Sequence, residues 1–171
     1  KGNLTSVTQI GNNPMNSVYE TGTADLKSEE DGTGKYTYVH DKTTHAVKSV
    51  SNDNIQLNLE YDSVGNTTGT TLVNTKNETD KKLSSSALYS GDSNYQDSNY
   101  MTKQTDTSGI TTSYTYDINR GLVKKSTTAQ TIKNQEGGKT DTTVTTNYSY
   151  NDNNNRQTLT YISNVEEAVY D

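Results

Sequence analysis

Two histidines flank a turn-forming aspartate, and these are the first residues whose types could do chemistry. His40 and His45 enclose Asp41 in a short polar stretch, and imidazole and carboxylate groups are ligands that suit zinc and related ions. Their spacing matches no known ligand pattern, however, and the stretch has the composition of a solvated turn. We therefore interpret Asp41 as a turn residue and expect neither a metal nor another cofactor.

Other acidic residues suggest calcium ligands only loosely. Asp92, Asp97 and Asp106 lie in polar segments, and Asp152 lies among asparagines. No stretch has the alternating acidic loop, with its central glycine and closing glutamate, that binds calcium in EF-hands. Asp is also common in turns, because its carboxylate accepts hydrogen bonds from nearby backbone N–H groups. We therefore expect these residues to form turns.

Candidate catalytic residues are equally isolated. A glycosidase needs a pair of carboxylates held at a fixed separation across a cleft. Acidic side chains are available in Glu29-Glu30-Asp31 and in Glu166-Glu167, but the sequence indicates no cleft between them. The serines at 84–86 could supply a nucleophile, but neither histidine has a context that marks it as a general base. The sequence therefore predicts a chain that is not an enzyme.

Composition and charge argue against several classes of partner. The 171 residues carry a formal net charge of −6 and give a pI near 4.9, which argues against binding to nucleic acid. The absence of cysteine excludes disulfides and thiol chemistry. No apolar run is long enough to span a bilayer, so we expect no membrane insertion. Hydrophobic residues are only 27% of the chain, but 13 tyrosines favour strands.

Residues 111–126 have the pattern of a β-hairpin. Thr112, Tyr114 and Tyr116 alternate with small polar residues, which places these three side chains on one face of a strand. Residues 117–121 then form a turn, because Asp and Asn bond to nearby backbone groups and Gly adopts positive φ without steric cost. The chain is expected to reverse there into a second strand.

Similar units recur along the sequence. Tyrosines at or near the ends of alternating segments follow one another at intervals of 20 to 34 residues, a range typical of repeat architectures. Such repeats cannot bury their apolar faces alone and must pack against their neighbours. The tyrosines that serve as anchors in this interpretation are Tyr38, Tyr61, Tyr95, Tyr116, Tyr150 and Tyr170.

Residues 61–66 and 116–121 carry the most specific motif: Tyr-Asp, then a turn containing Gly or Asn, then a Thr-rich or aliphatic strand. With five or six copies in register, the chain resembles the RHS/YD-repeat family, in particular wall-associated and secreted proteins of Gram-positive bacteria. In three copies the aspartate is displaced, and the last turn lacks glycine. The resemblance assigns a structural motif role to Tyr38, Asp41, Tyr61, Asp62, Gly65, Asn66, Tyr95, Asp97, Tyr114, Tyr116, Asp117, Gly121, Tyr148, Tyr150 and Asp152.

The repeats and the resemblance together predict an all-β fold. We expect tandem antiparallel β-hairpins in an elongated, twisted and curved sheet, like a section of a YD-repeat β-shell, with almost no helix. Residues 1–33 are expected to hold the end of a preceding repeat and a polar loop, and residues 34–171 the tandem repeats of a fragment of a larger protein. The buried face is expected to include Ile55, Leu57, Leu59 and Tyr61, because they alternate with polar residues.

The resemblance also implies a non-catalytic structural role. In the RHS/YD-repeat family such repeats build a shell or scaffold that encloses or displays a C-terminal effector, as in polymorphic toxins. The implied partners are neighbouring repeats and an effector domain of the same parent chain, at the cell wall, at the cell surface or in the secreted state.

Two other kinds of partner follow from the residues themselves. Exposed tyrosines could instead bind cell-wall or host carbohydrate in an adhesion module. Unpaired edge strands at residues 3–10 and beyond Thr158 could pair the isolated fragment into a homodimer.

Overall fold

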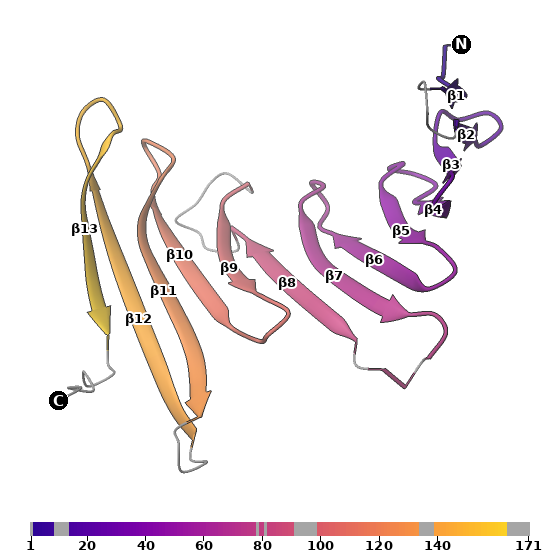
Figure 1. The fold of residues 1–171 in the computed structure, drawn as a ribbon. Coiled ribbons are helices and arrows are strands. Elements are labelled where there is room, and N and C mark those ends of the chain that lie inside the picture. The colour runs from indigo at the N-terminus through magenta and orange to yellow at the C-terminus, as the bar shows by residue number, and fades with distance from the viewer. Residues whose placement is uncertain are drawn as a thin grey trace. The chain divides into compact units, whose positions relative to one another are not determined.

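The computed structural model describes residues 2–8, 14–77, 79–80, 82–90, 99–133 and 139–163. The chain divides into two compact units, Lys1–Ser84 and Ser85–Asp171. Every regular element in the described ranges is a β-strand, which confirms the predicted all-β class and the expected lack of helix (Figure 1). Accordingly, no described segment forms an apolar helix that could cross a membrane.

The first unit contains an antiparallel sheet whose strands pair in sequence order. Each strand is hydrogen-bonded to the next one along the chain, so sequence neighbours are also spatial neighbours. Short turns join the strands from β2 onward. The strands are β1 (Ser6–Val7), β2 (Met15–Tyr19), β3 (Leu26–Asp31), β4 (Gly34–His40), β5 (Val47–Ser51), β6 (Ile55–Tyr61) and β7 (Thr67–Asn74).

The second unit repeats this arrangement with longer strands. Strand β8 (Leu83–Tyr89) begins at the end of the first unit and continues into the second, where it pairs with β9. Antiparallel pairing then follows sequence order to the last strand. The remaining strands are β9 (Met101–Thr105), β10 (Thr111–Asp117), β11 (Leu122–Lys133), β12 (Lys139–Tyr150) and β13 (Arg156–Ser163).

The structure places a strand where a polar loop was expected near the end of residues 1–33. Strand β3 occupies this segment, and the Asp31 carboxylate closes the turn between β3 and β4. Its Oδ1 accepts hydrogen bonds from the Thr33 and Gly34 amides at 2.7 and 3.1 Å. Charged residues are tolerated in β3 because both faces of the sheet remain partly exposed there. The hairpins therefore begin before the boundary expected at residue 33.

One face of each unit carries most of the aliphatic and tyrosine side chains. Tyr38, Val50, Leu57 and Leu72 are direct cross-strand partners in a row over β4 to β7. In the second unit the corresponding row joins a tyrosine to small hydroxyl residues on β10, β11 and β12. We call this side of each unit the tyrosine face; it is defined by Tyr38, Val50, Ile55, Leu57, Leu59, Tyr61 and Leu72 in the first unit, and by Tyr114, Tyr116, Ser126, Thr146, Tyr148 and Tyr150 in the second.

The opposite face is mainly polar, with exposed Val39 among its apolar side chains, and in the second unit its hydroxyl groups bond across strands. Thr127 and Thr145 are direct partners whose Oγ1 atoms lie 3.3 Å apart. Ser149 and Thr158 form a similar pair at 2.5 Å. Such pairs stabilise a sheet modestly, by about 0.2–1 kcal/mol each. We call this side the threonine face.

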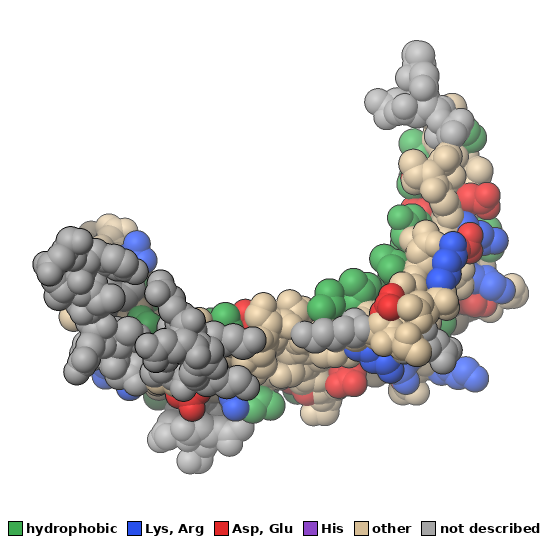
Figure 2. Space-filling view, turned by 60° about the horizontal axis from the view of Figure 1, so that its bottom comes forward, with side chains coloured by type: hydrophobic (Ala, Val, Ile, Leu, Met, Phe, Trp, Pro, Cys, Tyr) green, Lys and Arg blue, Asp and Glu red, His purple; other side chains and the backbone are tan. Residues whose placement is uncertain are grey.

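Neither face is covered by a second layer within the described ranges. No hydrophobic side chain there is fully buried, and the buried polar side chains are Ser126, Thr142 and Thr146. Leu57, Leu59 and Tyr61 are half-buried, whereas Ile55 is 43% exposed, so the expected buried face is only partly shielded. Figure 2 shows hydrophobic side chains lying open along one side of the first unit.

Candidate functional site

A β-bulge recurs at the end of the first strand in six hairpins: it lies immediately before the last residue of that strand in five of them, and before the second-last residue in β10. In β6 and β7, Glu60 pairs with Gly69 but Tyr61 pairs with Thr67, so Thr68 is an extra residue in the ladder. A bulge bends the strand and re-aims the neighbouring side chain. The residues after the register shifts are Tyr19, His40, Tyr61, Tyr89, Tyr116 and Tyr150.

The extra residue of each bulge is polar. In β5, for example, Lys48 lies between Ser49 and Val47, which pair with Val39 and His40. The extra residues of all six bulges, in chain order, are Lys27, Lys48, Thr68, Thr102, Lys124 and Gln157.

Five of the re-aimed rings bond to a main-chain carbonyl that precedes their own hairpin; the acceptor lies on the preceding strand in four cases, and for Tyr19 it is Leu4, just before β1. The Tyr61 hydroxyl donates to the carbonyl oxygen of Val47 at 2.9 Å, and Val47 in turn opposes His40 of the preceding hairpin. Each such bond therefore ties one hairpin to its predecessor. These linking residues and their carbonyl acceptors are Tyr19 with Leu4, His40 with Leu26, Tyr61 with Val47, Tyr116 with Met101, and Tyr150 with Val123.

The aspartate that follows Tyr61 closes its turn through its own carboxylate. Asp62 Oδ1 accepts from the Val64 and Asn66 amides at 3.0 and 2.9 Å, and Oδ2 accepts from Asn66 Nδ2 at 2.8 Å. Gly65 has φ of 95°, a conformation that other residues rarely adopt. Desolvation alone would raise the pKa of Asp62, but the hydrogen bonds from Asn66, Val64 and Gly65 together lower it.

Asp41 closes the preceding turn in the same way. Its Oδ1 accepts from the Thr43 and Thr44 amides at 2.9 and 3.0 Å. These two backbone bonds, Thr44 first, lower the pKa of Asp41 to about 2. In the last hairpin Asn151 takes this role, accepting from the amides of Asn153 and Asn155, while Asp152 lies one residue further into the turn.

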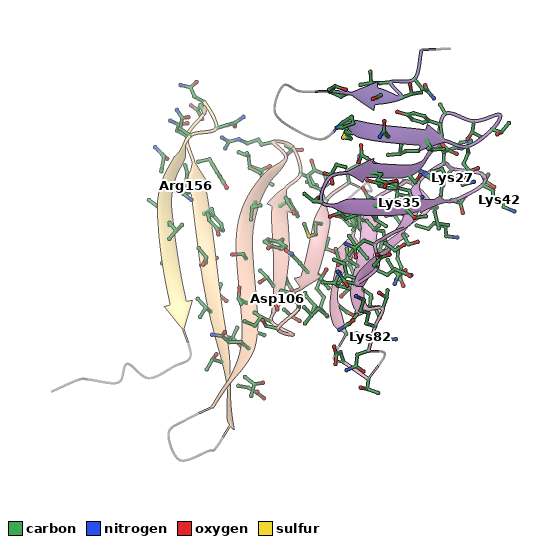
Figure 3. The ribbon with its side chains drawn as sticks, turned by 45° about the vertical axis from the view of Figure 1, so that its right-hand side comes forward. Lys27, Lys35, Lys42, Lys82, Asp106 and Arg156 are labelled. Atoms are coloured by element: carbon green, nitrogen blue, oxygen red, sulfur yellow. The ribbon has the colours of Figure 1, made fainter. Side chains whose placement is uncertain are left out.

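The turns at the opposite ends of the strands use the same chemistry. Asp106 Oδ1 accepts from the Ser108 and Ile110 amides at 2.8 and 3.0 Å. In Figure 3 Asp106 lies at the β9–β10 turn and Arg156 at the start of β13, at opposite ends of the strands. Side-chain acceptors of this kind are also supplied by Asp31, Asn52 and Asn74. Turn aspartates and asparagines thus shape both edges of each unit.

The remaining motif residues fall into three groups. Tyr38, Tyr114 and Tyr148 lie two residues before a linking residue, on the tyrosine face, where Tyr38 donates to Glu29 Oε2 at 3.3 Å. Asp117 accepts through its main-chain oxygen from the amide of Gly121, whose φ is 68°. The sequence anchors Tyr95 and Tyr170, with Asp97, lie outside the described residues.

Among the described residues, grooves lie between consecutive turns on the edge that carries the linking residues, and three of them are similar in composition. One of about 590 Å³ is lined by Asp41, Lys48 and Tyr61, among others, and lies between the β4–β5 and β6–β7 turns. Its equivalent between the β10–β11 and β12–β13 turns has about 430 Å³ and includes Lys124 and Tyr150. A third, of about 460 Å³, lies between the β2–β3 and β4–β5 turns. Each groove combines a tyrosine, a turn aspartate and a cation.

Arg120 bridges two consecutive turns of the second unit. Its Nε and Nη2 atoms donate to Asn154 Oδ1 at 2.8 and 2.7 Å, and Nη2 also donates to the carbonyl oxygen of Asn151. Its guanidinium carbon lies 5.9 Å from the centre of the Tyr150 ring, within the range of a cation–π contact. Asn154, with φ of 64°, presents its side chain to this guanidinium.

The two histidines make separate contacts and do not converge on a common point. His45 Nδ1 lies 2.8 Å from Asp25 Oδ2, while both nitrogens of His40 face main-chain carbonyl oxygens. No group of three or more metal-ligating side chains occurs in the portion of the chain that the structure describes. His45 thus joins the β4–β5 turn to the β2–β3 turn, whereas His40 bonds within its own turn and to β3.

The bulges, the linking role of His40 and the Arg120 bridge were not anticipated from the sequence. The sequence interpretation took Tyr38 as the anchor of its repeat. In the structure, however, His40-Asp41 has the position relative to the bulge and the turn that Tyr61-Asp62 has in the next hairpin. The available signal was the turn itself, because the acceptor side chain directly follows the linking residue in both hairpins.

Comparison with known proteins bears on the fold. No family model matches the sequence, and no curated protein matches it. The chain is similar to the solved structure titled "Crystal Structure of TcdB2-TccC3-TEV", with a TM-score of 0.61 and 10% sequence identity. The match covers 91% of this chain but only 10% of that chain. This likeness indicates an RHS-like fold, and the present sequence spans about a tenth of the chain that it matches.

Proposed function

We propose that this chain is a non-catalytic section of a larger, secreted or cell-surface β-repeat protein, and that it forms part of a wall around, or a support for, a C-terminal effector. The observation that carries the proposal is the sheet of linked hairpins in each unit, whose apolar side has no covering layer in the described ranges. A sheet of this kind gains stability from its neighbouring repeats. The structural similarity to part of a much longer chain supports the same role.

The proposal assigns the tyrosine face to the interior of the wall. Leu57, Leu72 and Val50 lie side by side on this face, and burying them against a folded or unfolded effector would remove apolar area from water. The threonine face, with its hydroxyl and lysine side chains, would remain in solvent. Turn aspartates and linking residues would hold the hairpins in register, and any catalytic activity would belong to the effector.

Cysteine labelling tests this assignment, because the chain has no native cysteine. Ile55 on the tyrosine face and Val39 on the threonine face are 43% and 52% exposed, so they form a matched pair. We would introduce Ile55→Cys or Val39→Cys into the parent protein, otherwise free of reactive thiols, and into the 171-residue chain. A bulky maleimide should label both positions at similar rates in the 171-residue chain. In the parent protein it should label position 55 at least about tenfold more slowly. Equal rates in the parent protein would rule out enclosure by this face.

A second candidate function is carbohydrate binding, and the equivalent grooves favour it. Each groove brings an aromatic ring together with turn carboxylates and a cation, and Tyr-rich polar surfaces are effective binding surfaces. A glycan array of the 171-residue chain distinguishes the two functions, since a wall segment predicts no saturable binding. Saturable binding that is lost in Lys48→Ala, which lines one of these grooves, but kept in Lys35→Ala, which lines none of the three, would favour the adhesion module.

A further inference from the structure

His40 is the one linking residue that is not a tyrosine, and it has two acceptors instead of one. Its Nε2 lies 2.9 Å from the carbonyl oxygen of Leu26 on β3, and its Nδ1 lies 3.0 Å from the carbonyl oxygen of His45 in its own turn. The four linking tyrosines each donate one proton from a hydroxyl group. A tyrosine hydroxyl stays protonated to about pH 10, whereas imidazole titrates near pH 6.5.

The two carbonyl oxygens can both be satisfied only by the imidazolium form of His40. A neutral imidazole has one N–H donor and one nitrogen lone pair, whereas the cation has two donors. In either neutral tautomer, one nitrogen lone pair would face a carbonyl lone pair at about hydrogen-bond distance. Deprotonation must therefore break either the link to β3 or the bond to the His45 carbonyl in the β4–β5 turn.

The charged groups around His40 come from every element packed against it. The β2–β3 turn supplies Glu20 and Asp25, and both carboxylates favour a cationic ring. Strand β4 supplies Tyr38, whose hydroxyl donates to Glu29 of β3. The surrounding cations are the lysine of the β3 bulge, two lysines of the β4–β5 hairpin and, when protonated, His45: they are Lys27, Lys42, Lys48 and His45.

Two of these side chains lie beside carboxylates. Lys48 Nζ lies 3.5 Å from Asp41 Oδ2, and His45 Nδ1 lies 2.8 Å from Asp25 Oδ2. The bond to the His45 carbonyl is the largest contribution that raises the pKa of His40. Desolvation opposes it, and the Leu26 carbonyl and the charges of Asp25 and Glu20 add to the increase.

We propose that His40 is an acid-strengthened link between hairpins: below neutral pH its Nε2 joins β4 to β3 while its Nδ1 bonds the His45 carbonyl in its own turn, and one of these two bonds is lost when the ring deprotonates. The sign follows from linkage: a basic group with a higher pKa in the folded state stabilises that state below its unfolded pKa. That stabilisation is lost as the pH rises through the folded pKa. The β4–β5 hairpin, which contains His40, is thus a pH-responsive part of the first unit.

The first test is an NMR titration of the imidazole nitrogens in the 171-residue chain and in the same chain unfolded in denaturant. The folded midpoint of His40 is expected to lie above the unfolded value of about 6.5, with both nitrogens protonated at pH 5.5. Above neutral pH the link should give the amides less protection from exchange. We expect this protection to fall about tenfold for each pH unit by which the folded midpoint of His40 exceeds the unfolded one. A folded midpoint at or below the unfolded one would overturn the proposal.

The second test replaces His40 with the residue that the other links use. Amide exchange of β3 to β5, corrected for base catalysis, should show several-fold less protection at pH 8.5 than at pH 5.5 in the unmodified chain. His40→Tyr should remove this pH dependence, whereas His45→Gln should retain it. A chain without the pH dependence, or one that loses it in His45→Gln but not in His40→Tyr, would contradict the assignment. If His40→Tyr does not fold, the titration decides the question.

Discussion

The hydroxyl of Tyr61 donates to the carbonyl oxygen of Val47, 2.9 Å away on the neighbouring strand, and this bond ties two hairpins together. Val47 opposes His40, which in turn bonds to Leu26, so in the first unit the links form a continuous series along one edge. The sheet thereby acquires repeat-to-repeat contacts even though none of its described hydrophobic side chains is fully buried. The individual links can be tested separately, because each is a single side chain.

Removing the Tyr61 hydroxyl should destabilise the first unit while leaving the ring in place. We expect Tyr61→Phe to lower the free energy of unfolding by about 1 kcal/mol, the usual net value of an intramolecular hydrogen bond. Urea denaturation followed by circular dichroism would measure the change. Tyr36→Phe, at a tyrosine that is 37% exposed, is the control and should cost less than half as much. Equal effects would mean that the link to Val47 adds nothing.

Truncating the whole ring should cost more than losing the hydroxyl. Tyr61→Ala or Tyr116→Ala is expected to lower the free energy of unfolding by about 3 kcal/mol, by analogy with large aromatic deletions. Tyr116 also lies against Tyr100, with ring centres 4.8 Å apart. Thermal and urea denaturation would measure both variants. A change below about half a kcal/mol in both, well under the usual range for such deletions, would show that the rings do not support the sheet.

The glycine of the Tyr61 turn should be sensitive to substitution for a reason that involves backbone alone. Gly65 has φ of 95°, and a Cβ added there would meet nothing within 4 Å. Gly65→Ala should therefore cost about 1–2 kcal/mol through backbone strain. Gly34→Ala is the matched control, because its Cβ also meets nothing and its φ is not positive. We expect the control to be neutral or slightly stabilising in the same denaturation assay.

Acid should weaken the β4–β5 turn through Asp41. Its pKa is lowered to about 2 in the folded chain from its ordinary value of 3.8, so its contribution to stability is complete above about pH 4. That contribution is lost as the pH falls from about 4 to 2. Asp41→Asn keeps a side-chain acceptor without a titrating proton and should flatten this part of the profile of melting temperature against pH. Asp152→Asn, one residue beyond the acceptor of its turn, should leave the profile unchanged; a change equal to that of Asp41→Asn would contradict the assignment.

Much of the local structure could be predicted from the sequence, because alternation and turn residues are local signals. The strand from Ile55 to Tyr61 and the Asp62 turn lie where the period-2 pattern and the Asp and Gly residues place them. The bulges could not be predicted in this way. Strict alternation puts Val47 and Val50 on opposite faces, whereas the extra residue Lys48 returns both to the face of their partners His40 and Tyr38.

Long-range contacts were the other part that sequence reasoning missed. The bond between His40 and Leu26 joins residues on neighbouring strands, and the choice of Tyr38 as anchor depended on residue type rather than on position relative to the turn. Polar strands such as Leu26–Asp31 were also missed, because a sheet with two partly exposed faces does not need the apolar alternation by which strands are recognised.

The bridge from Arg120 should matter to the last hairpin and should require the geometry of a guanidinium. The Nε and Nη2 atoms of Arg120 both donate to the side-chain oxygen of Asn154, and Nη2 also donates to the Asn151 carbonyl. A lysine ammonium cannot reproduce this forked contact while also reaching the Asn151 carbonyl. Arg120→Lys and Arg120→Ala should both speed amide exchange in the β12–β13 turn, each by the equivalent of about 1 kcal/mol. Arg156→Lys keeps a charge at the start of β13 without altering the bridge, and should leave that exchange unchanged. If Arg120→Lys behaved like the unmodified chain, charge alone would account for the contact between the two turns.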